Sequence, residues 1–147
     1  MSDARARRRA RELALQGLYQ RQVARHADSE IAADLATSPA WAACDQVYFG
    51  ELWKGVTGDY DRLLELVAAK LDRKPSELAP VERALLVIGA WELAQRTDIP
   101  WRAVIDEAIE LAKSYGGTDG YKFVNAVLDK LAPELRAGEF TVAGDAR

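Results

Sequence analysis

The sequence has few of the groups on which enzymes and secreted proteins depend. Its 147 residues include a single cysteine, Cys44, which can form no internal disulfide and favours a reducing compartment such as the cytoplasm. The single histidine, His26, has no nearby cysteine and belongs to no cluster with metal-ligand spacing. No apolar run approaches the ~20 residues of a membrane span, and the charged N-terminus is not a secretory signal. We therefore expect a cytoplasmic protein that is not an enzyme and has no catalytic residues, metal or cofactor.

Two segments resemble functional sites but have simpler explanations. The carboxylates of Asp106, Glu107 and Glu110 lack the Glu-x-x-His pattern of a di-metal bundle, so they predict a solvated helix face. Residues 116–120 are rich in glycine but lack the Gly-Lys-Ser/Thr of a phosphate-binding loop. They predict a helix end, with Gly116-Gly117 in a left-handed conformation, followed by a new helix start.

Positive charge is scarce overall but concentrated at one end. The chain has 20 basic and 23 acidic residues, for a net charge of −3, yet residues 1–25 contain seven arginines and only two acidic residues. Five of these arginines lie within seven positions: Arg5, Arg7, Arg8, Arg9 and Arg11. Such a cluster attracts a polyanion whatever the net charge, although a solvated helix end without a partner is the simpler alternative.

Apolar residues recur at helical spacing along nearly the whole chain, and no stretch alternates as a strand would. We expect helices over about 3–27, 28–35, 40–56, from 59 to a stop before Pro75, from Pro80 through at least Ala94, over 100–115 and over 119–133. Residues 84–94 are apolar nearly all round, which predicts a central core helix. The predicted fold is all-α, with about seven helices in a single domain over residues 1–133 and a loose tail over 134–147.

The first helix presents a face suited to nucleic acid. Arg5, Arg8, Arg9, Glu12, Gln16 and Tyr19 lie opposite the apolar stripe of Ala10, Leu13, Ala14, Gly17 and Leu18. Arginine matches phosphate oxygens, and Tyr19 can stack on an unpaired base or pack at a helix interface. Tyr121-Lys122-Phe123 forms a second, weaker basic and aromatic patch. These patterns predict a nucleic-acid-binding protein without distinguishing RNA from DNA.

Several motifs, in order, resemble those of the NusB family of bacterial transcription antitermination factors. They are Ala6-Arg-Arg-Arg-Ala-Arg-Glu12, Leu18-Tyr19, Tyr48-Phe49, Val81-Glu-Arg-Ala84, residues 98–117 and residues 122–132. The resemblance extends from about Ala6 to Pro133 and implies an all-α fold of two small helical bundles packed together. Residues 28–45 and the tail depart from the family most, so no contacts are transferred there.

The resemblance implies binding of boxA RNA together with NusE, a small-subunit ribosomal protein. The complex then helps RNA polymerase to read through terminators, notably in ribosomal RNA operons. Carried over by motif, the RNA-binding residues are Arg7, Arg8, Arg9, Arg11, Tyr19, Lys122 and Phe123, and the residues for NusE contact are Glu82 and Asp119. A homodimer that masks the arginines remains a hypothesis.

Two other functions remain open at the level of sequence. NusB-like domains also precede the catalytic domain of some RNA cytosine methyltransferases, although a chain ending at Arg147 leaves no room for a cofactor-binding α/β domain. The chain is alternatively a protein-interaction module whose arginines bind an acidic protein rather than RNA.

Overall fold

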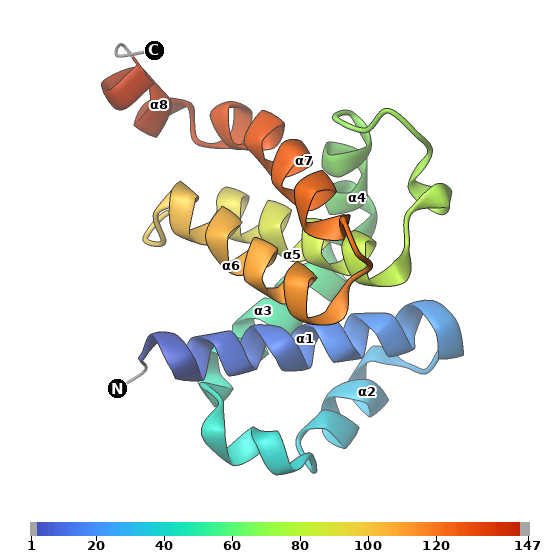
Figure 1. Ribbon diagram of the computed structural model, residues 1–147. Coiled ribbons are helices and arrows are strands. Elements are labelled where there is room, and N and C mark those ends of the chain that lie inside the picture. The colour runs from blue at the N-terminus through green and yellow to red at the C-terminus, as the bar shows by residue number, and fades with distance from the viewer. Residues whose placement is uncertain (1–2, 145–147) are drawn as a thin grey trace. The chain divides into compact units, whose positions relative to one another are not determined.

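The computed structural model describes the backbone of residues 3–144 and the side chains of residues 3–140. All regular structure in this part is helical, which confirms the predicted all-α fold (Figure 1). The α-helices are α1 (Ala4–Ala24), α2 (Asp28–Leu35), α3 (Gln46–Gly58), α4 (Tyr60–Ala68), α5 (Pro80–Gln95), α6 (Trp101–Tyr115), α7 (Gly120–Leu135) and α8 (Ala137–Gly144). Two 3₁₀ helices, η1 (Pro39–Ala43) and η2 (Pro75–Glu77), lie in the connections. No helix within the described range is long and apolar enough to cross a membrane.

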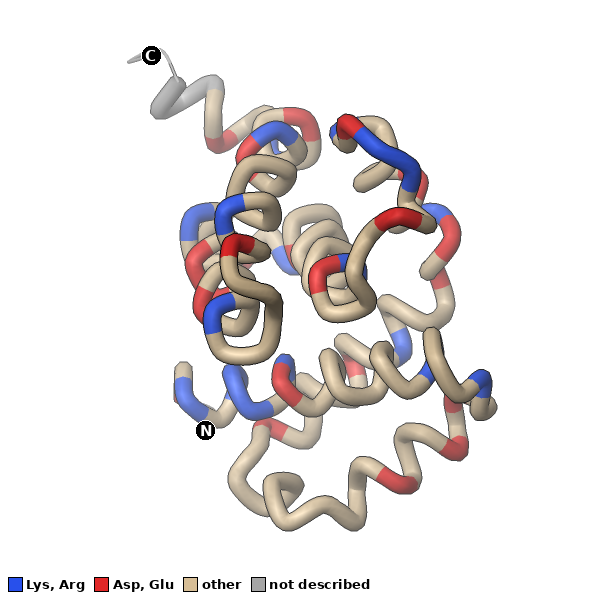
Figure 2. The backbone as a smooth tube through the Cα atoms, turned by 45° about the vertical axis from the view of Figure 1, so that its right-hand side comes forward, with Lys and Arg blue, Asp and Glu red and all other residues tan. Residues whose placement is uncertain are grey.

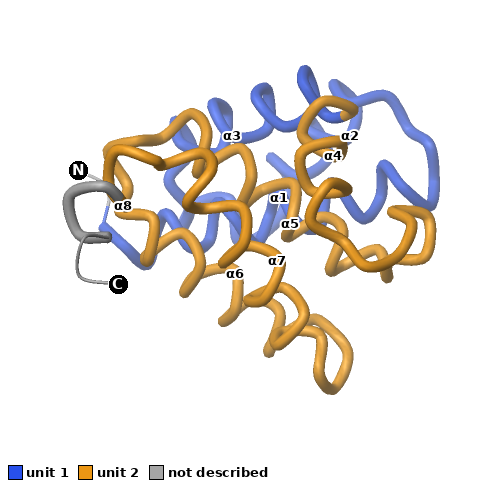
Figure 3. The backbone as a smooth tube through the Cα atoms, turned by 90° about the horizontal axis from the view of Figure 1, so that it is seen from above, with its two compact units in different colours: residues 1–60 blue, residues 61–147 orange. Residues whose placement is uncertain are grey.

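The chain divides after Tyr60 into two compact units, which are described separately (Figure 3). Unit 1 contains α1, α2, η1 and α3, and unit 2 contains nearly all of α4 together with η2 and α5 to α8. Two helical units agree with the two small bundles that the family resemblance implies.

Unit 1 is built on α1, whose apolar stripe packs against α2 and α3. The Asp3 carboxylate starts the helix by accepting a hydrogen bond from the Ala6 amide at 2.7 Å. The predicted stripe is buried throughout. A Cβ on Gly17 would lie only 2.6 Å from Cζ3 of Trp53, so glycine allows α1 to approach this ring closely.

The helix predicted over residues 40–56 is divided into η1 and α3, which corrects the prediction. Asp45 causes the break, because its carboxylate accepts from the Tyr48 amide at 2.9 Å and caps a new helix. The Asp45 amide also donates to the Ala6 carbonyl at 2.9 Å, which ties the break to α1. Cys44 and Tyr48 are buried, whereas Trp41 on η1 is half-buried.

Unit 2 is centred on α5, which packs against both α6 and α7. Every residue from Ala84 to Leu93 is buried, which confirms the predicted core helix. At Gly89 the helix meets the side chain of Leu128 from α7, and an added Cβ would lie 2.9 Å from its Cδ2 atom.

The end of α6 and the C-terminal end of α7 differ from the prediction, whereas α7 starts after Asp119 as expected. Gly116 ends α6 in an extended conformation (φ −93°), and among the described glycines none has a positive φ. At the other end α7 continues through Pro133 to Leu135, and α8 follows where a loose tail was expected; residues 145–147 lie outside the described residues. Arg136, which lies between α7 and α8, attaches this part of the chain to α5. Its buried guanidinium donates hydrogen bonds to the carbonyls of Leu93 (2.6 Å) and Arg96 (2.8 Å) at the end of α5.

Candidate nucleic-acid interface

Basic residues are concentrated in the N-terminal half of α1 (Figure 2). Three of its arginines are exposed on the face that the helical spacing predicts. We call Arg5, Arg8, Arg9, Glu12, Gln16 and Tyr19 the arginine face. Its three arginines are exposed, and Tyr19 has 45% of its surface accessible. The face therefore offers both guanidinium groups and an aromatic ring to a ligand.

The other two arginines of the cluster turn toward α3. The guanidinium carbon of Arg7 lies 4.5 Å from the centroid of the Tyr48 ring, and that of Arg11 lies 5.6 Å from the same centroid. Arg11 is only 4% exposed and Tyr48 only 2%, while Arg7 is half-buried. The structure thus places Arg11 inside unit 1 rather than on the surface expected of an RNA-facing side chain. Both arginines hold α1 against α3 through cation–π contacts.

Electrostatics on the arginine face favour an anionic partner. Arg9 and Glu12 form an ion pair at 3.3 Å within the face, and the Arg9 side chain remains 48% exposed. The first turn of α1 contains no acidic residue, and the Asp3 carboxylate that precedes it caps the helix. Cations near a helix N-terminus oppose the helix dipole and repel each other, so a bound polyanion relieves both effects.

A second group of candidate residues meets where α7 begins in unit 2. Lys122 and Asp119 form an exposed ion pair, with Nζ and Oδ1 3.4 Å apart. Glu82, in the first turn of α5, lies against Gly120, so that a Cβ there would clash with its carboxylate. The structure therefore brings the two candidate partner-binding residues, Glu82 and Asp119, beside the candidate RNA-binding Lys122 and Phe123.

Sequence reasoning missed one member of this group. Arg73, in the connection between α4 and η2, places its guanidinium carbon 4.5 Å from the centroid of the Phe123 ring. Its Nε donates to Asp72 at 2.9 Å, and this hydrogen bond lowers the pKa of the Asp72 carboxyl. Fifty positions separate Arg73 from Phe123, and no spacing rule connects them. We call Arg73, Glu82, Asp119, Lys122 and Phe123 the α7 corner.

The family is decided by comparison with known proteins. The model of the NusB family matches residues 8–133, which is most of the chain. The chain belongs to the NusB family. Its NusB relatives include the Transcription antitermination protein NusB of Ralstonia pickettii (strain 12J), 48% identical over 91% of this chain and 86% of that protein. That of Nitrosomonas eutropha is 52% identical over 90% of this chain and 80% of its own length. These names confirm the prediction of a family of transcription antitermination factors and not of enzymes.

Solved NusB structures share the fold. T. maritima NusB is 29% identical, with a TM-score of 0.79 over 91% of this chain and 94% of that chain. A structure of the antitermination factors NusB and NusE in complex with double-stranded RNA is 22% identical, with a TM-score of 0.77 over 90% of this chain and 99% of that chain. At this lower identity the likeness concerns the fold alone.

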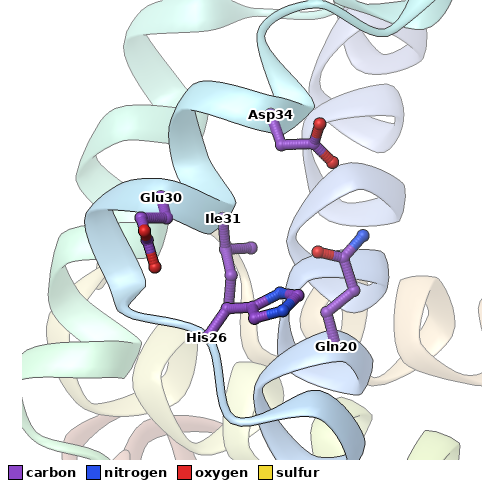
Figure 4. Close-up of a pocket in the computed structure, with 5 residues that line it drawn as sticks. All are labelled: Gln20, His26, Glu30, Ile31 and Asp34. Atoms are coloured by element: carbon purple, nitrogen blue, oxygen red, sulfur yellow. The ribbon is translucent and has the colours of Figure 1, made fainter.

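The remaining polar groups of this NusB-family chain include a pocket in unit 1 and a buried thiol. A shallow pocket between the end of α1 and α2 is lined by Gln20, His26, Glu30, Ile31 and Asp34 (Figure 4). Glu30 is engaged in capping α2 through the Ala27 amide at 3.1 Å. Within the described residues no group of His, Cys, Asp and Glu could hold a metal ion. Burial raises the pKa of the Cys44 thiol, which keeps it in its protonated, unreactive form.

Proposed function

We propose that this protein is a transcription antitermination factor that binds boxA RNA together with the NusE ribosomal protein. In this role it promotes read-through by RNA polymerase, notably in ribosomal RNA operons. The observation that supports the proposal most directly is the arginine face, where Arg5, Arg8 and Arg9 are exposed on the side of α1 that also bears Tyr19. Family membership supplies the biological setting for this surface.

On the arginine face, each residue type has a definite task in the proposal. Guanidinium groups of Arg8 and Arg9 donate to phosphate oxygens, and Tyr19 stacks on an unpaired base. Arg7 and Arg11 lie outside the arginine face and support it by holding α1 against Tyr48 of α3. Since phosphate contacts dominate, the protein alone binds weakly and with strong salt dependence.

At the α7 corner, RNA-binding and partner-binding tasks are divided between neighbouring side chains. Lys122 and Phe123 extend the RNA surface, while Glu82 and Asp119 face NusE. A solved complex of NusB and NusE with double-stranded RNA has a similar fold and supports the binding of both partners by this protein. Pre-assembly with NusE adds contact surface and raises RNA affinity, because part of the ordering cost is met before RNA binds.

Other partners follow from the same role. The RNA-bound protein joins the antitermination complex of RNA polymerase in the cytoplasm. A homodimer is the state in which the arginine face would be masked, and sedimentation at several protein concentrations tests for it.

The test is a titration of boxA RNA with and without NusE, at fixed salt, using a scrambled RNA for comparison. We expect the double variant Arg8→Glu and Arg9→Glu to lose boxA binding, since it reverses two charges on the arginine face, while helicity and NusE pairing persist. The matched control is Arg62→Glu with Arg102→Glu, which changes the net charge equally on exposed arginines of unit 2. Wild-type affinity in the first variant, or an equal loss in the control, contradicts the proposal.

A further inference from the structure

Arg73 occupies a position in unit 2 that its local sequence does not explain. It lies in an irregular connection between α4 and η2, yet its guanidinium is stacked on Phe123, a half-buried residue in the first turn of α7. The Arg73 side chain remains 44% exposed in this position. The ring therefore orients one face of an exposed, planar cation that has five N–H donors.

Two further cations lie near the ring of Tyr121, which is two positions before Phe123 on α7. The Lys113 ammonium lies 5.1 Å from the centroid of the Tyr121 ring, and that of Lys122 lies 6.0 Å from it. Three separate segments thus place cations over the two aromatic rings in the first turn of α7: the connection after α4, the end of α6 and the start of α7. Single-stranded nucleic acid is bound by this combination, because bases stack on rings or guanidinium planes while cations meet the phosphates.

Nearby carboxylates do not prevent such binding. Arg73 pairs with Asp72 at 2.9 Å and Lys122 with Asp119 at 3.4 Å, and all four side chains are largely exposed. Exposed ion pairs are weak in water, and a phosphate offers the guanidinium a bidentate partner in exchange. The Arg73–Asp72 bond uses the Nε donor, which leaves the terminal nitrogens to face a ligand.

We propose that Arg73 is an RNA-binding residue, whose guanidinium, stacked on Phe123, contacts a phosphate of the bound single strand. The inference rests on the proposed RNA-binding function and extends its surface to a segment outside α1 and α7. Phe123 then acts both as a stacking ring and as the support that orients Arg73.

The experiment measures boxA RNA affinity of the full chain by fluorescence anisotropy across a series of salt concentrations. We expect Arg73→Gln to lower the affinity about fivefold and to reduce the slope of log affinity against log salt by about 0.7, the value of one phosphate contact on a single strand. Arg73→Lys should keep the slope but not the full affinity, since an ammonium lacks the planar fork.

The matched control is Arg102→Gln. Arg102 is also exposed and also lies over an aromatic ring, that of Trp101, at 4.6 Å. It sits at the opposite end of α6 from the α7 corner, about 22 Å along a helix of 15 residues. We expect this variant to retain both affinity and slope, and circular dichroism verifies that both variants remain folded.

The outcomes of these titrations separate a failure of the role proposed for Arg73 from a failure of the proposed RNA-binding function. If Arg73→Gln keeps wild-type affinity and slope while the Arg8→Glu, Arg9→Glu variant loses binding, the role of Arg73 is overturned and the proposed function stands. If Arg73→Gln instead weakens only NusE binding, the residue belongs to the protein interface and its assignment to RNA is wrong. If the unmodified chain binds boxA no better than scrambled RNA, both the proposed function and the role of Arg73 fall.

Discussion

Arg11 offers the sharpest test of how the arginine cluster works. The family motif includes it among the RNA-facing residues, whereas the structure buries it to 4% exposure beside Tyr48. We therefore predict that Arg11→Gln affects stability and leaves RNA electrostatics unchanged. Arg8→Gln, on the exposed face of the same helix, should do the opposite.

The expected magnitudes follow from burial and charge. Loss of a desolvated cation–π contact and of the packing of a buried guanidinium should lower the free energy of unfolding by about 1–3 kcal/mol in Arg11→Gln. An exposed substitution such as Arg8→Gln should change it by less than about 0.5 kcal/mol. For RNA, loss of one phosphate contact lowers the salt slope by about 0.7, so the affinity lost between 50 and 200 mM salt should shrink about 2.6-fold in Arg8→Gln.

Two assays separate the effects. Urea denaturation followed by circular dichroism reports the free energy of unfolding, and boxA titrations between about 50 and 200 mM salt report the slope. A variant Arg11→Gln with wild-type stability but a lower slope would refute the reasoning, because it would show that this side chain reaches a phosphate despite its burial.

Two stability predictions concern the packing that supports these surfaces. Arg136→Met should lower the free energy of unfolding by about 3 kcal/mol or more, since it removes the hydrogen bonds that the buried guanidinium donates to the carbonyls of Leu93 and Arg96 at the end of α5. Glu139→Gln keeps those bonds and should cost less. A loss under about 1 kcal/mol in Arg136→Met would contradict the anchoring role. Gly17→Ala should cost about 1–3 kcal/mol because its Cβ meets Trp53. At Gly50 an added Cβ has nothing within 4 Å, so Gly50→Ala should instead stabilise α3 by up to about 1 kcal/mol. Thermal unfolding measures both variants, and equal effects of the two glycine substitutions would be incompatible with this packing.

The family motif and the helical period give different roles to the same arginines. Spacing on α1 alone puts Arg8 and Arg9 opposite the apolar stripe, and the structure exposes both. Transfer of the whole motif added Arg7 and Arg11, which the structure turns toward Tyr48. A motif records which residues occur together, whereas the period of 3.6 residues determines which of them share a face.

Local chemistry was sufficient for much of the fold. Several features were predictable from the sequence: the bounds of α2, the start of α5 at Pro80 and of α6 directly after Pro100, the buried face of α1 and the concentration of positive charge near the N-terminus. Each depends on spacing, capping or composition within one or two helical turns, so a single stretch of chain contains the necessary information.

Only the tertiary structure decided which distant groups meet. It placed Arg73 on Phe123, brought Glu82 to the start of α7, and used Arg136 to bind the end of α5 where a loose tail was expected. These contacts depend on how connections direct one helix onto another, and helical periodicity contains no information about that direction. The sequence by itself therefore determined an all-α protein with a basic helix face, and the tertiary structure selected which basic side chains present that charge and which support it.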